Sequence, residues 1–293
     1  GKEVYSFVDI VVRDVMHEEV SLLRHRRLHS TIGSALEELY SDKVDEHLSE
    51  LAYHFLDGGN EDKALEYFLK AGEKAEKVYA HGEATSYFQL TLEILEGKKG
   101  KLHERASVLE RLGDIKRLVG EYGACMKYWN EALPLWIQMQ EKERMAGVHR
   151  KMASVLWDNM GDVEKAKGHH TEALEILETG PKSIELASLY EDMASMYMAT
   201  GDAAKALSWA EKALDLTKEL NAQEVMAGSY VTLGVILPET GDVKRAVVCL
   251  ESALRIALDN NYMETAIRAY SSLGYILPAE ESYTIQKRLE YSE

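Results

Sequence analysis

Residues 201–206 read GDAAKA, and close variants of this hexapeptide recur along the chain. The variants are GEYGAC at 120–125, GDVEKA at 161–166 and GDVKRA at 241–246. The first glycines of the four copies are spaced by 41, 40 and 40 residues (120 to 161, 161 to 201 and 201 to 241). A fixed period of this length is typical of repeat proteins, in which each repeat is one supersecondary unit that stacks on the next.

Small residues recur at fixed distances from each of these glycines. Five positions after the glycine are Cys125, Ala166, Ala206 and Ala246, and twelve positions after it are Ala132, Ala173, Ala213 and Ala253. Seven positions before it are Gly113, Ala194 and Gly234, whereas Ala153 lies eight positions before Gly161. Glycine ends a helix in a left-handed cap, and an acidic residue after it favours the start of the next helix. Small residues let two antiparallel helices approach closely, so we predict one helix hairpin per repeat.

These residues resemble the tetratricopeptide repeat (TPR). In that pattern a small residue lies in the first helix, Gly-Asp forms the turn, and two alanines follow in the second helix. The period of about 40 residues is longer than the usual value of about 34, which implies longer helices. We therefore expect an all-α fold, a right-handed α-solenoid superhelix of TPR-like helix hairpins with about 14 helices.

The pattern divides the chain into four parts. We expect an N-terminal helical junction at 1–45, irregular TPR-like helices at 46–96, a hinge at 97–101 (GKKGK) and a regular array with C-terminal capping helices at 102–293. Within the junction, a strand-like run at 5–10 precedes two expected helices at about 11–20 and 21–40.

The first 95 or so residues also resemble a junction in large signal-transduction ATPases of the STAND class and in LuxR-type and cyclase-associated regulators. The matching features are Phe7, RRLH at 26–29, IGSALE at 32–37 and LAYHF at 51–55, whereas Asp9 stands where that pattern often has a His. The resemblance implies that the chain is the C-terminal sensor arm of a larger signalling ATPase or transcription regulator. Arg24, Arg26 and Arg27 form a basic helix face that we expect to dock the upstream domain of the same protein.

The composition restricts the classes of partner. Hydrophobic residues make up 46% of the chain, charged residues 29%, and the formal net charge is −16. So acidic a chain repels phosphate backbones, which argues against direct nucleic-acid binding. No apolar run approaches the length of a membrane span, and Cys125 and Cys249 have no metal-type spacing. These features predict a cytoplasmic protein without a membrane segment.

No motif in the sequence indicates catalysis. GKKGKL at 97–102 lacks both the spacing and the preceding strand of a phosphate-binding loop. His25 and His29 have metal-compatible spacing, but no third ligand follows and the neighbouring arginines repel a cation. His169 and His170 are expected at the surface of a second helix. We therefore expect a protein that is not an enzyme, with no cofactor and no metal site.

A TPR-like stack carries its ligands on the concave face, which the first helices line. The positions that the resemblance assigns to this groove are Glu110, Asp114, Arg117, Arg150, Trp157, Glu191, Ser195, Met198, Val231, Val235, Ser271 and Tyr275. TPR domains that bind chaperone tails have a clamp of Lys, Asn and Arg, and acidic or apolar residues replace it here. A groove that is acidic at one end and apolar at the other suits a basic or amphipathic protein or peptide partner.

The alternative function is a small-molecule sensor, for a sugar or a nucleotide. A sugar site needs stacked aromatic rings and several polar groups in one pocket. Trp157 and Tyr275 lie too many repeats apart to provide it.

A second motif occurs twice near the end of the chain, as LGVILP at 233–238 and LGYILP at 273–278. Proline lacks the N–H that would bond to the carbonyl four residues earlier, and its ring crowds that carbonyl. We predict that the two first helices bend or end near Leu237 and Leu277. On this interpretation the motif marks the last two repeats and is neither a catalytic nor a ligand signature.

Overall fold

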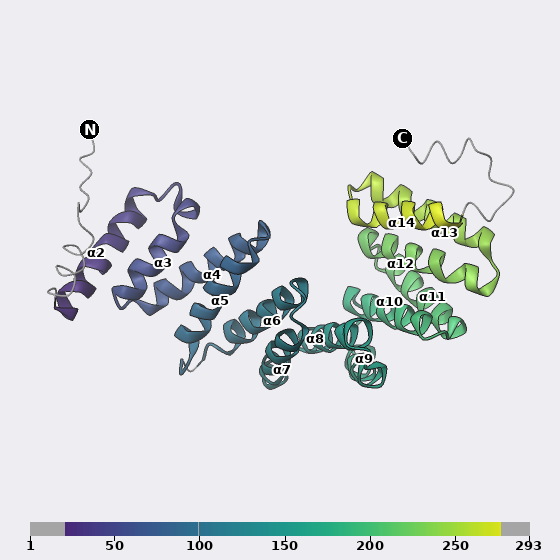
Figure 1. Ribbon diagram of the computed structural model, residues 1–293, viewed down its shortest axis with the longest axis horizontal. Coiled ribbons are helices and arrows are strands. Elements are labelled where there is room, and N and C mark those ends of the chain that lie inside the picture. Colours follow the sequence, from purple (N-terminus) through teal and green to yellow (C-terminus); the bar gives the residue numbers. More distant parts are fainter. Residues whose placement is uncertain (1–20, 99, 277–293) are drawn as a thin grey trace. The chain divides into compact units, whose positions relative to one another are not determined.

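The computed structural model describes residues 21–98 and 100–276, and every regular element in these ranges is helical (Figure 1). Its α-helices are α2 (Leu22–Leu39), α3 (Leu48–Asp57), α4 (Glu61–Lys77), α5 (His81–Leu95), α6 (Leu102–Leu118), α7 (Tyr122–Met139), α8 (Lys142–Ser154), α9 (Val163–Glu178), α10 (Ile184–Ala199), α11 (Ala203–Glu219), α12 (Gln223–Ile236), α13 (Val243–Asp259) and α14 (Met263–Ile276). The predicted all-α solenoid is confirmed. The helix expected at 21–40 is α2, whereas the strand-like run and the helix expected at 11–20 lie outside the described residues.

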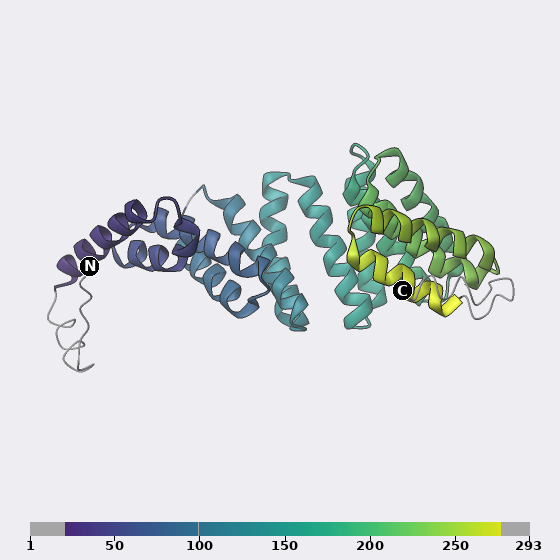
Figure 2. The ribbon, with the colours of Figure 1, turned by 90° about the horizontal axis from the view of Figure 1, so that it is seen from above.

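The helices form two compact units, with the boundary between Ala132 and Leu133, inside α7. In the first unit, the helices from α2 to α6 each pack on the next along the chain. In the second unit, α8 with α9, α10 with α11, and α12 with α13 form hairpins that lie side by side (Figures 1 and 2). The first helices α8, α10, α12 and α14 also contact one another in order, more extensively than the second helices do. The first helices therefore form the inner layer of this unit.

The turn inside each hairpin has the geometry that the sequence predicts. Gly161, Gly201 and Gly241 have φ angles of 72°, 83° and 87°, in the left-handed region that favours glycine. The aspartate that follows each glycine caps the second helix. The side chain of Asp202, for example, accepts a hydrogen bond from the backbone N–H of Lys205. Each Gly-Asp pair thus ends one helix and starts the next.

The two helices of a hairpin meet at a small residue of the first helix, which in several hairpins faces a large residue of the second. In three hairpins the small residue is a glycine, and a Cβ there would lie closer than 3.0 Å to the facing side chain. The pairs are Gly72 with Phe88, Gly113 with Trp129, and Gly234 with Leu250. The large residue always follows the glycine by sixteen positions (72 to 88, 113 to 129 and 234 to 250). The absence of a side chain therefore sets the distance between the helices.

The hairpin of α4 and α5 belongs to the same register, although it lies in the segment expected to be irregular. Tyr79 occupies the turn position, 41 residues before Gly120 (79 to 120), and has a φ of 59°. Gly72 lies seven positions before Tyr79 and Ala84 five positions after it, as in the other repeats. Because this repeat has a tyrosine where the others have the turn glycine, a search for Gly-Asp turns does not find it.

A π-helical turn at Val155–Asn159 explains the displaced position of Ala153. A π turn closes its hydrogen bond one residue later than an α-helix does, and so adds one residue to the helix. The same insertion accounts for the spacing of 41 between Gly120 and Gly161, against 40 in the following repeats.

Pro238 ends α12 as predicted. The α-helix stops at Ile236, and residues Leu237–Thr240 form a short 3₁₀ helix before the turn at Gly241. Pro278 lies outside the described residues, so the second half of this prediction stays open.

The two LGxILP copies provide a matched test of helix packing. A Cβ at Gly234 would collide with Leu250, whereas a Cβ at Gly274 would meet no atom of the described residues within 4 Å. Gly234→Ala should therefore lower the free energy of unfolding by about 1–3 kcal/mol. Gly274→Ala should raise it by about 0.5–1 kcal/mol, because alanine favours helix. Chemical and thermal unfolding curves would measure both changes, and equal effects of the two variants would contradict this account of the packing.

Candidate functional site

The first helices α10, α12 and α14 line two adjoining hollows that share Met198 and Val235. Their volumes are about 330 and about 240 Å³. The remaining lining residues are Pro238, Glu239, Ser271, Ser272, Tyr275 and Ile276 in the larger hollow, and Ser195, Ala199, Thr232, Ile236 and Arg268 in the smaller one. We call this combined surface the inner hollow. Its walls are mainly apolar, which is typical of ligand and peptide sites.

Both copies of the LGxILP motif contribute to the inner hollow. Val235 and Pro238 come from the first copy, and Tyr275 and Ile276 from the second. Tyr275 is 87% exposed and Val235 is also exposed, although both are large apolar residues. The motif that the sequence analysis treated as purely structural thus places exposed apolar side chains on a candidate binding surface.

Five of the twelve residues predicted for the groove meet at the inner hollow: Ser195, Met198, Val235, Ser271 and Tyr275. Val231 lies on the same helix as Val235 but is buried in the hydrophobic core. The predicted groove residues thus include side chains of α10, α12 and α14 that line one hollow, and burial decides which of them are accessible.

Arg150 lies on α8 and joins two carboxylates of α10. Its Nε donates to Glu185 at 2.7 Å, and one of its terminal nitrogens donates to Asp192 at 2.8 Å. The three side chains are each about one quarter exposed, so the contacts are partly shielded from water. Charge-assisted bonds to two carboxylates hold the guanidinium in place. Arg150 therefore ties one repeat to the next.

Glu191 on α10 makes the equivalent connection to α12. Its carboxylate accepts a hydrogen bond from the hydroxyl of Ser229, and Arg268 and Arg150 attract it. Burial is the largest influence and raises the pKa of Glu191 to about 7, with a further increase from Asp192. A carboxylate that is partly protonated at neutral pH thus lies on a helix of the inner layer.

Two of the predicted groove residues in the first unit hold Trp129 in place. The indole N–H donates to the backbone oxygen of Glu110 and to the carboxylate of Asp114, each at 3.2 Å. Glu110 is buried, whereas Arg117 on the same helix is exposed. Trp157 of the second unit lies in the π-helical turn, and its buried indole N–H has no partner among the described residues.

The predicted docking residues Arg24, Arg26 and Arg27 are exposed on α2. Leu22 and Leu23, on the first turn of the same helix, are exposed as well. The helix therefore presents basic and apolar side chains together.

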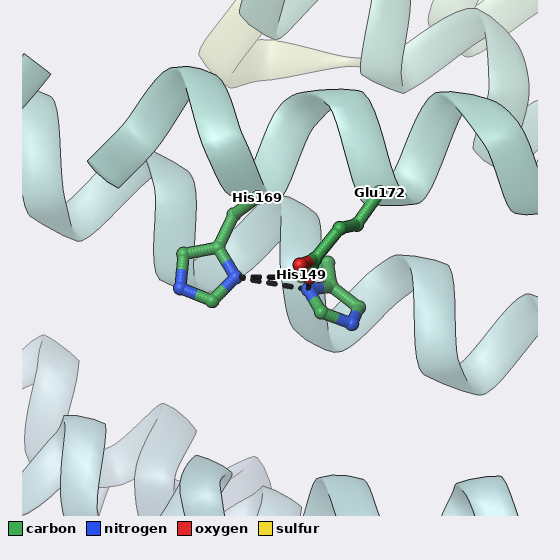
Figure 3. Close-up of side chains that lie close together, drawn as sticks. All are labelled: His149, His169 and Glu172. Carbon is green, nitrogen blue, oxygen red and sulfur yellow. Dashed lines mark hydrogen bonds and ion pairs between the residues drawn. The ribbon is translucent and has the colours of Figure 1, made fainter. Parts of the chain in front are cut away.

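A group of metal-ligating side chains occurs where the sequence analysis did not expect one. His149 on α8 faces His169 and Glu172 on α9 (Figure 3). Within the described ranges it is the one group of three or more His, Cys, Asp or Glu side chains close enough to share an ion. The spacing of 169 and 172 on one helix face was visible in the sequence, but the contact with residue 149 required the fold.

The expectation that His170 lies at the surface is wrong. The residue is 1% exposed and follows Gly161 by nine positions, as Trp129 follows Gly120 and Leu250 follows Gly241. This position is buried in every one of these repeats, including the Gly201 repeat, where it holds Ala210. Burial, together with the charges of Arg150 and His169, lowers the pKa of His170 to about 4, so the ring is neutral at physiological pH. The repeat register itself could have predicted this burial.

None of the described helices combines the length and the apolar character that crossing a membrane requires.

Comparisons with known proteins agree with the repeat architecture. The family model described as tetratricopeptide repeat matches residues 144–219 and 185–259. Similar solved structures include BtubC (BKLC) from P. vanneervenii, with 18% identity, a TM-score of 0.59 and coverage of 83% of this chain and 93% of that chain. Rap protein complexed with competence and sporulation factor has 16% identity, a TM-score of 0.60 and coverage of 91% and 80%. The apo quorum sensor NprR from B. thuringiensis has 12% identity, a TM-score of 0.62 and coverage of 90% and 74%.

At these identities the likeness supports the fold and no particular activity. A search of proteins with curated function gave no match.

The raised pKa of Glu191 predicts a pH dependence of stability. Between the ordinary value of 4.5 and the folded value of about 7, the folded chain binds more protons than the unfolded chain. Stability should therefore fall as the pH rises through this interval, and Glu191→Gln should lack this decline. Relative to the variant, the wild type should lose on the order of 2 kcal/mol between pH 5 and pH 8. Thermal unfolding at several pH values measures the difference.

Glu224→Gln, which changes an exposed carboxylate at the start of α12, serves as the control. Parallel pH profiles of the wild type and Glu191→Gln would show that Glu191 does not titrate in this interval.

Proposed function

We propose that the second unit binds a segment of a protein partner at the inner hollow. The observation that carries the proposal is the exposure of Val235 and Tyr275, from two successive first helices, around a hollow that Met198 of a third helix also lines. Large apolar side chains gathered on one accessible surface are typical of interaction sites. Because the first helices form the inner layer, a bound segment would contact several repeats at once.

The lining residues favour an amphipathic segment. The apolar walls would take its hydrophobic side chains, as in the groove mode of peptide recognition. Glu239 on one side offers a contact to a basic residue, and the exposed Arg268 on the other offers a contact to an acidic one. The sequence analysis expected a basic or amphipathic partner. Arg268 adds a place for one acidic residue of that partner.

We further propose that this binding regulates a larger signalling ATPase or transcription regulator. The support is the likeness of the first 95 or so residues to such junctions, together with the exposed Arg24, Arg26 and Arg27 on α2. Partner binding at the inner hollow would act as a population shift, by favouring one arrangement of the upstream domain over another.

A small-molecule sensor is the second candidate. The volumes of the two hollows lie near the lower end of the range for small-ligand sites. However, Tyr275 is the one aromatic residue that lines the hollow within residues 21–98 and 100–276, and a sugar site needs stacked rings. A peptide segment therefore fits this surface better.

A displayed library of random peptides tests the proposal without knowledge of the natural partner. Peptides selected on the wild type should bind Met198→Asp and Val235→Asp at least about tenfold more weakly, because each variant places a charge in the apolar wall. Fluorescence anisotropy of the labelled peptide measures the affinity.

Val248→Asp makes the same chemical change at a 60% exposed position of α13, a second helix, and should leave the affinity unchanged. Equal binding by all three variants would contradict the proposal. A metabolite that raises the Tm of the wild type but not that of Val235→Asp would favour the small-molecule alternative.

A further inference from the structure

The hairpin of α8 and α9 carries a second site, which does not depend on the proposed function. Nδ1 of His149 lies 2.9 Å from Nδ1 of His169 and 2.9 Å from Oε2 of Glu172. The same Glu172 oxygen lies 3.9 Å from Nδ1 of His169. Figure 3 shows the two side chains of α9 directed toward His149 on the facing helix.

Hydrogen bonds alone do not satisfy these contacts. Nδ1 of His149 carries at most one proton, and that proton can be directed at His169 or at Glu172 but not at both. When Nδ1 of His149 donates to Glu172, it has no lone pair left to accept from His169, and when it accepts from His169, its lone pair faces a Glu172 oxygen at 2.9 Å. A cation among the three atoms would accept a lone pair from each of them and remove the conflict.

We propose that His149, His169 and Glu172 bind a divalent transition-metal ion, with Zn²⁺ as the ion that their donor atoms favour. The three donor atoms all lie within 4.8 Å of one another, close enough to share one ion with Zn–N and Zn–O bonds of about 2.0 Å. The measured separations of 2.9, 2.9 and 3.9 Å bracket the separation of about 3.3 Å between ligands of a tetrahedral zinc ion.

The neighbouring repeat shows what these positions hold when they serve packing alone. His169 and Trp209 both follow their turn glycine by eight positions (161 to 169 and 201 to 209). His149 lies twelve positions before Gly161, and Tyr190 lies eleven positions before Gly201 (149 to 161 and 190 to 201). The π-helical turn adds the one extra residue, so the two positions are equivalent. The ring centroids of His149 and His169 are 5.1 Å apart, and those of Tyr190 and Trp209 are 5.3 Å apart.

The third position differs in charge between the two repeats. Glu172 and Lys212 both follow their turn glycine by eleven positions (161 to 172 and 201 to 212). The ammonium of Lys212 lies 4.0 Å from the ring centroid of Trp209, as a cation over an aromatic face. In the α8–α9 hairpin all three positions instead carry metal-ligating side chains. The three positions that pack Tyr190, Trp209 and Lys212 together in one repeat therefore hold the donor atoms of a metal site in the α8–α9 hairpin.

The surroundings keep the ligands in the form that binds metal. Burial lowers the pKa values of His149 and His169, which favours neutral imidazoles with free lone pairs, although Glu172 acts in the opposite direction. Arg150, the neighbour of His149 in sequence, donates hydrogen bonds to two carboxylates of α10, which offset its positive charge. Lys142 and Glu175 line the same hollow with opposite formal charges.

The donor set and the open side of the site define the class of ion. Two imidazoles and one carboxylate suit zinc and its neighbours, whereas Mg²⁺ and Ca²⁺ prefer oxygen ligands alone. His149 and Glu172 line an open hollow of about 610 Å³. A fourth ligand, from water or from a partner, can therefore reach the ion. The ion would join α8 to α9 across the hairpin.

Metal titration of the full chain, without a polyhistidine tag and after treatment with a chelator, tests the proposal. Zn²⁺ in competition with a chromogenic chelator should bind at one ion per chain and raise the Tm. Co²⁺ should give the intense visible absorption of a tetrahedral site. Glu172→Gln, at a side chain that is 59% exposed, should weaken Zn²⁺ binding at least about tenfold without unfolding the chain.

The neighbouring repeat supplies a variant that keeps the packing. The triple substitution His149→Tyr, His169→Trp and Glu172→Lys installs the side chains of Tyr190, Trp209 and Lys212, and should abolish Zn²⁺ binding while the helical content is retained. His103→Gln changes an exposed histidine of α6 and should bind as the wild type does. Failure of the wild type to bind Zn²⁺, unchanged binding by Glu172→Gln, or loss of binding in His103→Gln would each overturn the proposal.

Discussion

The architecture depends on how closely two helices of one hairpin can approach. At the crossing point of three hairpins the first helix has a glycine, and a single added carbon there would collide with the facing side chain. Trp129 and Leu250, which face two of these glycines, are fully buried. Close approach buries large side chains within a hairpin, and stacking of hairpins buries further apolar surface.

This constraint also determines where a binding surface can form. When the first helices stack in an inner layer, the side chains that face the core become buried and cannot contact a partner. Val231 is one of them. The residues one turn further along, such as Val235, are left at the surface. Pro238 then ends α12 early and provides part of the wall of the inner hollow. A residue that interrupts the helix for structural reasons thus shapes the surface that we propose binds a partner.

Sequence reasoning predicted the features that repeat and missed those that deviate. The Gly-Asp turns, the small residues where helices approach closely and the helix end at Pro238 follow from local chemistry and were predictable. Tyr79 was missed because a tyrosine in a left-handed conformation has no local signal. The sequence showed that Ala153 is displaced by one position, but it did not show that a π-helical turn causes the displacement.

The candidate sites were predictable to different degrees. The periodicity predicts which helices face inward, whereas the burial of Val231 and the exposure of Val235 on the same helix required the structure. The cluster around His149 could not be found by spacing alone, because its ligands come from two helices and the π-helical turn shifts their register. Repeat-by-repeat comparison of equivalent positions reveals it, since three packing positions there differ together from those of the next repeat.

The central claim is that the inner surface of the second unit, and not its outer helices, receives the partner. Photo-cross-linking tests it most directly, with a photoreactive residue at position 235 on α12 or at position 248 on α13. A selected peptide should become covalently attached to the chain modified at 235 and not to the chain modified at 248. Attachment at 248 and none at 235 would contradict the account.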